Sequence, residues 1–247
     1  MIEFIDIHKR FGSNVVLDGV SITVDTGQVL YIIGASGAGK SVLVKHLIGL
    51  LRPDSGRIIL DGEDITWLDE EGFYPIRRKC AMVFQNSTLF DSMTLLENVM
   101  LPLRKHHKMG RKEAAKAARA KLELVNMDRD ADQYPAAIGD GLRKRVAIAR
   151  ALTLDPQFVI FDEPTTGLDP MAAATVDDLI RSLRSDAGVT CVVVSHDLRS
   201  IFTVADRIAM IYKGKIRLDG TPEQFRNSDD GVIHQFVNGL PEGPMSV

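Results

Sequence analysis

The hydrophobic and polar positions of the first part of the chain predict strands. Residues 2–11 and 15–27 alternate in the manner of paired strands, and residues 55–65 form a similar piece around an Asp-Gly turn. Residues 28–40 begin with a short, Ile-rich apolar run and end in glycines, and residues 40–53 have helical spacing. We therefore expect an antiparallel β portion near the N-terminus, followed by a buried strand, a loop and a helix.

The middle of the chain has a different pattern. Residues 94–104 and 111–125 combine helical spacing with a helix-forming composition. This pattern predicts a mostly helical insertion over residues 86–150.

Strands and helices alternate again in the last part of the chain. An apolar run at 157–163 is followed by a helical pattern at 172–185 and a second apolar run at 189–196. This order predicts a parallel sheet with both faces covered. Residues 207–222 predict a closing hairpin, which a helix and a polar tail follow.

Composition narrows the class of protein. The chain has 247 residues, of which 45% are hydrophobic and 26% charged, as in a soluble globular protein of one large domain or a core with an inserted subdomain. The net charge of -3 gives no reason to expect nucleic-acid binding. Cys80 and Cys191 form no metal or redox motif, and Cys191 in an apolar run indicates a reduced core residue in a reducing compartment. We find no signal peptide and no apolar run long enough to span a bilayer, so we expect membrane contact only through a partner.

A phosphate-binding loop follows the predicted buried strand. Residues 34–41, GASGAGKS, match the pattern G-x-x-x-x-G-K-[ST] between a strand and a helix. Its glycines let backbone N–H groups approach a phosphate, Lys40 can reach the β- and γ-phosphates, and the Ser41 hydroxyl can hold Mg²⁺. The predicted nucleotide-binding residues of this loop are Gly34, Ala35, Ser36, Gly37, Ala38, Gly39, Lys40 and Ser41.

Polar residues also follow three apolar runs. Asp162 and Glu163 end the run at 157–163; near a phosphate loop, Asp162 can bind Mg²⁺ and Glu163 can act as general base for an attacking water. Without that loop, the same acids would fit a solvated strand end that caps the next helix. His196 can hydrogen-bond a γ-phosphate, or be a structural residue, and the Gln85 amide can contact Mg²⁺ or water.

These pieces, in this order, resemble the ATP-binding subunit of ABC transporters over nearly the whole chain. The resemblance implies an α/β P-loop NTPase (RecA-like) fold over residues 1–240, with an antiparallel β subdomain, a helical insertion and a tail at 241–247. It also implies ATP and Mg²⁺ as cofactors, Gln85 as the Q-loop residue, Glu163 as the catalytic glutamate and His196 as the switch histidine. Phe11 matches the aromatic residue that stacks on adenine, and Asp169 ends the D-loop motif GLD.

Two stretches are similar to the Mla/Mce-associated lipid transporters. They are residues 89–104 and residues 225–244, whose counterpart in that subfamily reaches the partner ATPase subunit. The similarity implies phospholipid transport between the inner and outer membranes of a bacterium, with the chain peripheral on the cytoplasmic face of the inner membrane. The implied partners are a permease dimer, a Mce-domain protein and a small accessory subunit. An ABC ATPase for another substrate remains the alternative.

The signature loop departs from the family. Alignment of residues 142–152 with the family's signature helix places Gly139, Asp140 and Gly141 at the loop, where a serine and a glycine are replaced. In the family this loop contacts ATP bound to a second copy of the chain, so an acid here adds charge near a phosphate. Asp140 can point away and cap the helix, with residues 143 and 144 offsetting its charge. Otherwise the loop is impaired, so that the protein closes or hydrolyses ATP weakly, or the subfamily tolerates the variant loop.

The intact remaining motifs favour a competent, slow ATPase over an ATP-gated subunit with weak or no hydrolysis. A soluble ABC protein of DNA repair would need a long coiled-coil insertion, which the sequence lacks. Basic residues 143–145 are interpreted as a solvated helix face, residues 106–107 as an exposed turn and Trp67 as ordinary packing. The apolar residues of 93–103 fit either core packing or a groove for a short permease helix.

Overall fold

The computed structural model describes residues 1–245, which contain two sheets. The smaller sheet is antiparallel, with the strand order β2-β1-β4-β5. As predicted, it is built from the alternating segments near the N-terminus, and Asp61-Gly62 forms the turn between its last two strands. Its strands are β1 (Ile2–Phe11), β2 (Asn14–Val24), β4 (Ser55–Leu60) and β5 (Glu63–Asp64).

The larger sheet has six strands in the order β10-β9-β3-β8-β7-β6, and only the β9–β10 pair is antiparallel. Every residue of β3, β7 and β8 is buried, which explains why these strands are almost entirely apolar. Because the strands from β9 to β6 run in parallel, their carboxyl ends meet at one edge. The strands are β3 (Val29–Ile33), β6 (Cys80–Val83), β7 (Phe158–Asp162), β8 (Thr190–Val194), β9 (Arg207–Tyr212) and β10 (Lys215–Gly220).

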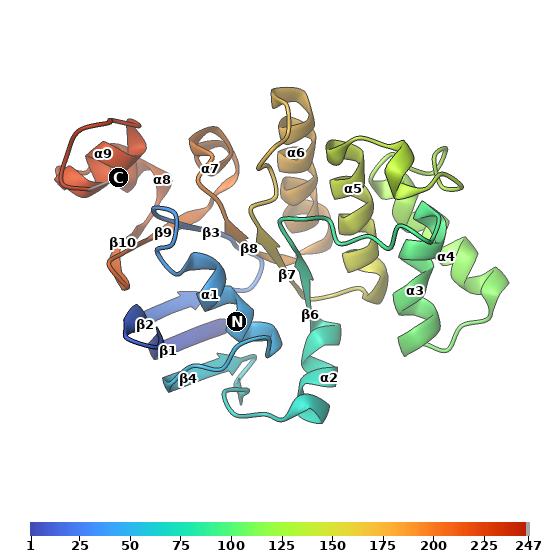
Figure 1. The fold of residues 1–247 in the computed structure, drawn as a ribbon, viewed down its shortest axis with the longest axis horizontal. Coiled ribbons are helices and arrows are strands. Elements are labelled where there is room, and N and C mark those ends of the chain that lie inside the picture. Colours follow the sequence, from blue (N-terminus) through green and yellow to red (C-terminus); the bar gives the residue numbers. More distant parts are fainter. Residues whose placement is uncertain (246–247) are drawn as a thin grey trace.

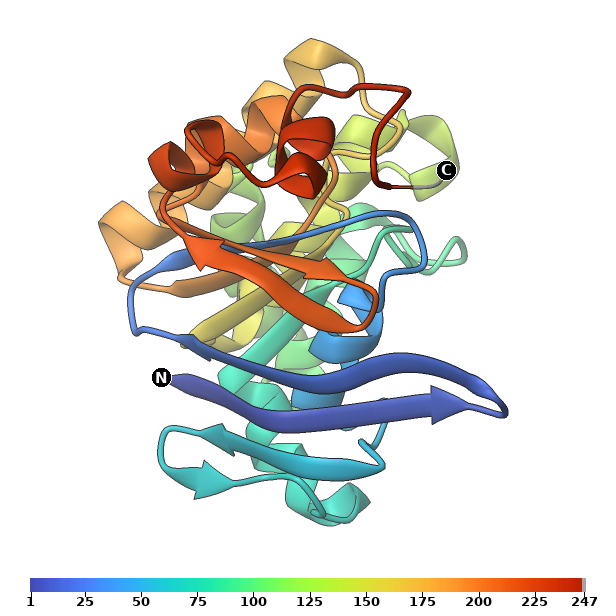
Figure 2. The same cartoon turned by 90° about the vertical axis from the view of Figure 1, so that its left-hand side faces the viewer.

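Each face of the six-stranded sheet is covered. The antiparallel sheet, α1 (Lys40–Lys45) and α2 (Glu70–Lys79) share one apolar core with the first face. The other face packs against α6, α7 and the C-terminal helices, as Figures 1 and 2 show. These helices are α6 (Pro170–Ala187), α7 (Leu198–Val204), α8 (Pro222–Arg226) and α9 (Gly231–Val237).

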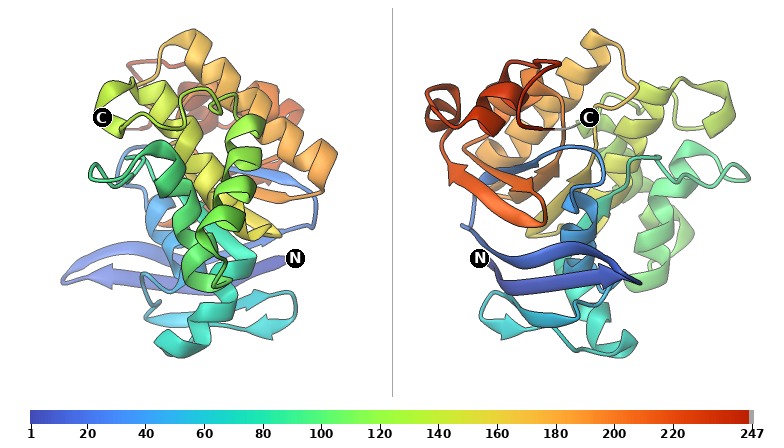
Figure 3. Two further views of the ribbon diagram at one scale, coloured as in Figure 1. Left: turned by 90° about the vertical axis from the view of Figure 1, so that its right-hand side faces the viewer. Right: turned by 60° about the vertical axis from the view of Figure 1, so that its left-hand side comes forward.

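The predicted helical insertion has an apolar core of its own. Its helices are α3 (Leu95–His106), α4 (Arg111–Leu124) and α5 (Asp140–Ala151). Figure 1 shows them on the opposite side of the molecule from α8 and α9, and they face the viewer in the left view of Figure 3. Thr94 starts α3 with a capping box that includes Glu97.

Several sequence expectations need correction. The helix expected over 40–53 ends early, because a 3-10 turn (His46–Ile48) follows α1 and Gly49 then adopts a φ of 68°. Trp67, interpreted as packed, is 58% exposed. Two helices, α2 and α7, had no counterpart in the sequence prediction. Residues 106–107 are exposed, as predicted, but they are not a separate turn, because His106 is the last residue of α3 and His107 is its C-cap. Among residues 1–245, no helix combines the length and apolar character needed to cross a membrane.

Candidate nucleotide-binding and hydrolysis site

The loop between β3 and α1 depends on its glycines. Gly34 has a φ of 143°, and a Cβ there would lie 2.3 Å from the Ile211 carbonyl oxygen. Gly39 has a φ of 100°, and a Cβ there would lie 2.8 Å from Leu17 Cδ2. Glycine alone fits both the backbone conformation and the space, so the sequence motif has a steric cause here.

Lys40 lies across this loop. Its Nζ donates to the carbonyl oxygens of Gly34 at 2.8 Å and of Ala35 at 3.0 Å. Burial lowers the pKa of the ammonium, while the nearby carboxylates of Glu163 and Asp162 oppose the shift. The two carbonyl oxygens thus hold the Lys40 ammonium beside the loop, where it can attract an anion.

Ser41 and Asp162 form an oxygen pair beside the loop. The Ser41 hydroxyl donates to Asp162 Oδ1 at 2.6 Å, and Asp162 is a buried residue at the end of β7. A hydroxyl and a carboxylate are hard oxygen donors of the kind that Mg²⁺ prefers, so the residues fit the cation that the sequence implied. Gln85, the third predicted ligand, follows β6 and is exposed.

Glu163 lies one residue beyond Asp162 and is held from two sides. His196 Nδ1 lies 2.9 Å from its Oε2, and Thr166 Oγ1 donates to the same oxygen at 3.0 Å. Its backbone has a φ of 53°, which is uncommon for a residue with a side chain, and its N–H donates to the Val194 carbonyl. The carboxylate is therefore fixed at the sheet edge, as a general base requires.

These groups line one cavity of about 710 Å³. Most of the predicted site residues meet there: Gly34, Ala35, Ser36, Gly37, Lys40, Ser41, Gln85, Glu163 and His196. Ala38 packs against the apolar core instead, and Asp162 lies behind Ser41. The two strand-end acids and the histidine thus converge as the parallel topology predicted.

The C-terminal segment also reaches this cavity, which no pattern in the sequence indicated. The wall of the cavity includes Leu198, Gln235, Phe236, Gly239, Leu240 and Met245. The Gln235 amide exchanges two hydrogen bonds with the Met245 backbone, at 2.7 Å and 3.1 Å, and Tyr212 Oη donates to the Pro244 carbonyl. The tail through residue 245 therefore folds back on its own chain (Figure 2). Residues 246 and 247 of the predicted tail lie outside the described residues.

The signature residues line a different cavity, of about 610 Å³. Gly139, Asp140 and Gly141 meet the D-loop residue Asp169 there. Asp169 caps α6 by accepting from the N–H groups of Met171 and Ala172. Among residues 1–245, none of these four lines the cavity of the phosphate loop.

Asp140 does not cap its helix, contrary to one account from the sequence. Gly139 occupies the N-cap position without a side-chain bond, and Asp140 is the first residue of α5. The Asp140 carboxylate accepts instead from Arg143, with Oδ1 lying 2.5 Å from Nη2. The expected charge compensation is confirmed for Arg143, whereas Lys144, the other residue expected to offset Asp140, donates to backbone carbonyl oxygens instead.

The basic run at 143–145 is not a solvated face throughout. Lys144 is 2% exposed, and its Nζ donates to the Phe84 and Gln85 carbonyl oxygens. Arg145 donates to the Val125 carbonyl. The sequence carried no sign of this burial, because a lysine between two arginines has the pattern of an exposed helix face.

Phe11, the predicted adenine contact, lies at the end of β1 and is 48% exposed. The Lys9 ammonium lies 5.5 Å from the centre of its ring. Among the described residues, Phe11 does not line the cavity of the phosphate loop. Stacking of this ring on adenine stays a prediction.

Comparisons with known proteins point to one family. The family model described as ABC transporter matches residues 17–166. The chain is 39% identical to the probable ribonucleotide transport ATP-binding protein mkl of Mycobacterium bovis, over 100% of this chain and 68% of that protein. It is 34% identical to the intermembrane phospholipid transport system ATP-binding protein MlaF of Escherichia coli, over 99% of this chain and 91% of that protein. The structure also resembles the dimeric, post-hydrolysis ATP-binding cassette MJ0796 bound to ADP and Pi, with a TM-score of 0.82, 30% identity and coverage of 90% and 99% of the two chains.

Proposed function

The chain belongs to the ATP-binding subunits of ABC transporters, and we propose that its ATPase activity powers phospholipid transport between the inner and outer membranes of a bacterium. The support for this substrate is the similarity to MlaF along 99% of the chain, together with residues 89–104 and 225–244. Other relatives are named for different cargo: mkl for ribonucleotides, and MetN of Rhizobium johnstonii, 40% identical over 89% of this chain and 60% of that protein, for methionine.

Hydrolysis is assigned to the residues around Glu163. The phosphate loop and Lys40 hold the β- and γ-phosphates, and the Glu163 carboxylate takes a proton from an attacking water. A bond then forms between the water oxygen and the γ-phosphorus, and the bond to the β–γ bridging oxygen breaks, leaving ADP and phosphate. His196 orients Glu163 through its 2.9 Å contact. Mg²⁺, held by Ser41 and Asp162 with Gln85 nearby, would neutralise charge on the phosphate oxygens.

Two copies of the chain complete the site in this proposal. The support is that the signature glycines and the phosphate loop line separate cavities within one chain. A second copy, turned by a two-fold rotation, would place its Gly139–Gly141 over the first copy's nucleotide. The N-terminus of α5 would then offer its unpaired N–H groups to the γ-phosphate. The similarity to a dimeric cassette is consistent with this arrangement.

A permease helix is proposed to bind beside α3. Two neighbouring cavities share Pro102, His106 and Arg150, and the larger, of about 580 Å³, extends to Leu50 and Phe84. The smaller includes Phe90, which is 49% exposed. An apolar groove with charged margins suits an amphipathic helix. Through this permease the chain would lie at the membrane, with a Mce-domain protein and a small accessory subunit as further partners.

The observation that carries the catalytic assignment is the double anchoring of Glu163 Oε2 by His196 and Thr166. The test is steady-state phosphate release by purified protein and its Glu163→Gln variant. We expect the variant to keep ATP binding and to lose roughly 100-fold or more in rate. An unchanged rate would show that hydrolysis does not use this carboxylate.

Gly139 supports a second candidate, an ATP-gated subunit that scarcely hydrolyses ATP. Gly139 lacks the hydroxyl of the family's serine, which removes one hydrogen bond to the phosphate. The Gly139→Ser variant distinguishes the two. A wild-type rate at background level that the Gly139→Ser substitution raises strongly would favour gating, whereas a measurable wild-type rate supports the ATPase.

The substrate needs its own test. We would purify the tagged full-length chain from membranes of its native organism and identify bound proteins and lipids by mass spectrometry. Phospholipid and a Mce-domain protein in wild-type samples, and their loss from a Phe90→Glu/Leu101→Glu variant, are expected. A permease for amino acids or nucleotides in their place would contradict the lipid assignment.

A further inference from the structure

Lys144 is a buried cation outside the set of residues assigned above. It lies on α5, four residues after Asp140, and is 2% exposed. Burial lowers the pKa of its ammonium, and the acids Asp162, Asp140 and Glu163 oppose that shift. A lysine is almost never fully buried without partners, because the loss of hydration destabilises its charge. Its contacts therefore indicate why the position holds a cation.

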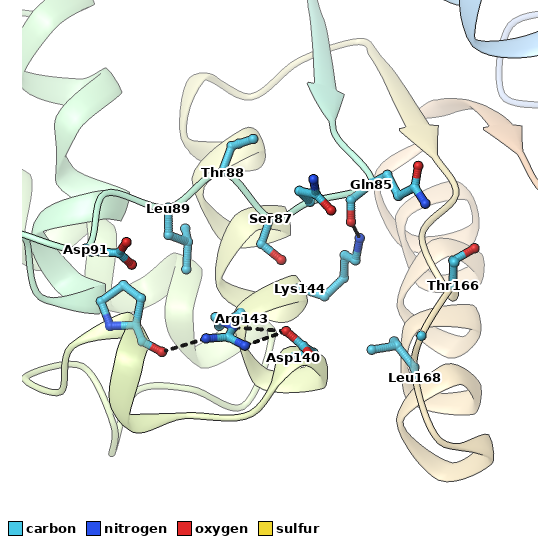
Figure 4. Close-up of a pocket in the computed structure, with 13 residues that line it drawn as sticks. Gln85, Ser87, Thr88, Leu89, Asp91, Asp140, Arg143, Lys144, Thr166 and Leu168 are labelled. Carbon is cyan, nitrogen blue, oxygen red and sulfur yellow. Dashed lines mark hydrogen bonds and ion pairs between the residues drawn. The ribbon is translucent and has the colours of Figure 1, made fainter.

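The ammonium contacts the backbone just beyond β6. Lys144 Nζ donates to the Phe84 carbonyl at 3.3 Å and, at shorter range, to the Gln85 carbonyl. Figure 4 shows the side chain reaching from α5 to Gln85, whose own amide points toward the segment that contains Thr166. A bond from a cation is stronger than one from a neutral donor, so the position of this backbone is fixed.

Gln85 connects the Lys144 contact with the cavity of the phosphate loop. Its side chain lines the cavity of the phosphate loop, together with Glu163 and Ser41. The backbone oxygen of Gln85 accepts from Lys144. Gln85 also lines a second cavity of about 390 Å³, between the segment that follows β6 and α5. Among residues 1–245, no side-chain hydrogen bond anchors the Gln85 amide, so the backbone contact sets where the amide can reach.

We propose that Lys144 is a positioning residue: its ammonium fixes the backbone of Gln85 so that the amide meets the Mg²⁺ and water side of the nucleotide. This inference rests on the proposed ATPase site. Because Lys144 and Asp140 share the first turns of α5, the same contact ties the signature loop of a chain to its own Gln85. A displacement of α5 is thereby transmitted to the hydrolysis site of the same chain.

The alternative is that Lys144 only fills space under α5. The two accounts differ in whether the effect of removing Lys144 depends on the Gln85 amide. If the lysine acts through that residue, its removal changes the Mg²⁺ requirement of the site and adds nothing once the Gln85 amide is gone. If it only packs, its removal lowers thermal stability without regard to Gln85.

The experiment compares full-length wild-type protein with Lys144→Met, Lys144→Arg, Gln85→Ala and the Lys144→Met/Gln85→Ala double variant. Lys121→Met is the matched control, because it removes a lysine bonded to Asp155 in the same helical region but outside the site. For each we would measure ATP binding as a function of Mg²⁺, the kcat and KM of phosphate release, and the thermal midpoint.

We expect Lys144→Met to raise the Mg²⁺ concentration for half-maximal binding and to lower kcat, each by roughly 10-fold, as removal of other outer-shell partners does. Lys144→Arg should restore part of both, Lys121→Met should match wild type, and the double variant should equal Gln85→Ala. Unchanged Mg²⁺ dependence in Lys144→Met, or additive losses in the double variant, would overturn the inference. If the proposed function itself fails, wild-type protein will show no Mg²⁺-dependent ATP binding, which is a different result.

Discussion

Arg143 forms an ion pair with the Asp140 carboxylate, in which Nη2 and Nε of the arginine lie 2.5 Å and 3.2 Å from Oδ1. Asp140 replaces a glycine of the family's signature loop, and its side chain is 74% exposed. Arg143 also donates to the Pro135 carbonyl, so its guanidinium is oriented from two sides (Figure 4). The structure thus explains how an acid is accommodated where a second copy's phosphate is expected.

The first prediction concerns this ion pair. Arg143→Met leaves Asp140 uncompensated near the proposed phosphate, so we expect kcat to fall about fivefold, since an exposed pair contributes about 1 kcal/mol or less. Asp140→Asn in the same background should restore the rate. Steady-state phosphate release measures both. A double variant as slow as Arg143→Met would mean that the arginine acts independently of the carboxylate.

The second prediction concerns His196. Its Nδ1 lies 2.9 Å from Glu163 Oε2, so His196→Ala removes the group that orients the general base. We expect a loss of about 100-fold in kcat with unchanged ATP affinity, which is within the range for general-base catalysis. Thr166→Val is a useful comparison, because Thr166 donates to the same oxygen from a neutral hydroxyl. An equal loss of ATP affinity would contradict an orienting role.

The third prediction uses a pair of glycines. Gly34→Ala brings Cβ to 2.3 Å from the Ile211 carbonyl, whereas Gly188, with a φ of 64°, has open space within 4 Å. Gly188→Ala should therefore lower the free energy of unfolding by about 1 kcal/mol through backbone strain alone. Gly34→Ala should lower it further and abolish ATP binding. Chemical unfolding and a nucleotide-binding assay test the pair, and equal effects of the two variants would show that the close approach is unimportant.

The fourth prediction is a pH dependence of stability. Asp177 is buried on α6, and burial raises the pKa of its carboxyl above the ordinary 3.8, although Ser200 donates to it at 2.8 Å. Asp197 adds to this shift, while Arg199 and Arg181 oppose it. Between pH 3.8 and the raised pKa, the folded state therefore binds more protons than the unfolded state. The contribution of Asp177 to the free energy of unfolding falls as pH rises from 3.8 through the raised value.

Asp177→Asn removes this dependence. The free energy of unfolding of the variant, relative to wild type, should rise with pH across that window and then stay constant. The rise should be about 1.4 kcal/mol for each tenfold difference between the acid dissociation constants of Asp177 in the unfolded and folded states. Urea unfolding between pH 4 and pH 8 measures the difference. Parallel profiles for the two proteins would show that Asp177 has the same pKa in both states.

Local patterns determined much of the fold. The apolar residues 158–161 and 191–194 predicted strands buried on both faces, and the glycines at 34, 37 and 39 predicted a tight loop. The boundary errors occurred where single residues decide the outcome, as at Gly49, whose φ of 68° ends the 3-10 turn after α1 before the expected limit at residue 53. Trp67 is exposed and belongs to the short connection between β5 and α2. Sequence spacing does not report which side of such a connection faces solvent.

The sequence by itself specified the chemistry of the site: a glycine loop, a lysine, two acids and a histidine at the ends of parallel strands. Only the tertiary structure decided which groups meet. It separated the signature glycines from the phosphate loop, placed five residues between Gln235 and Met245 in the wall of that cavity and buried Lys144 against Gln85. The physical reason is that strand and loop patterns depend on neighbouring residues, whereas burial and ion pairing depend on chain segments that are distant in sequence and adjacent in space.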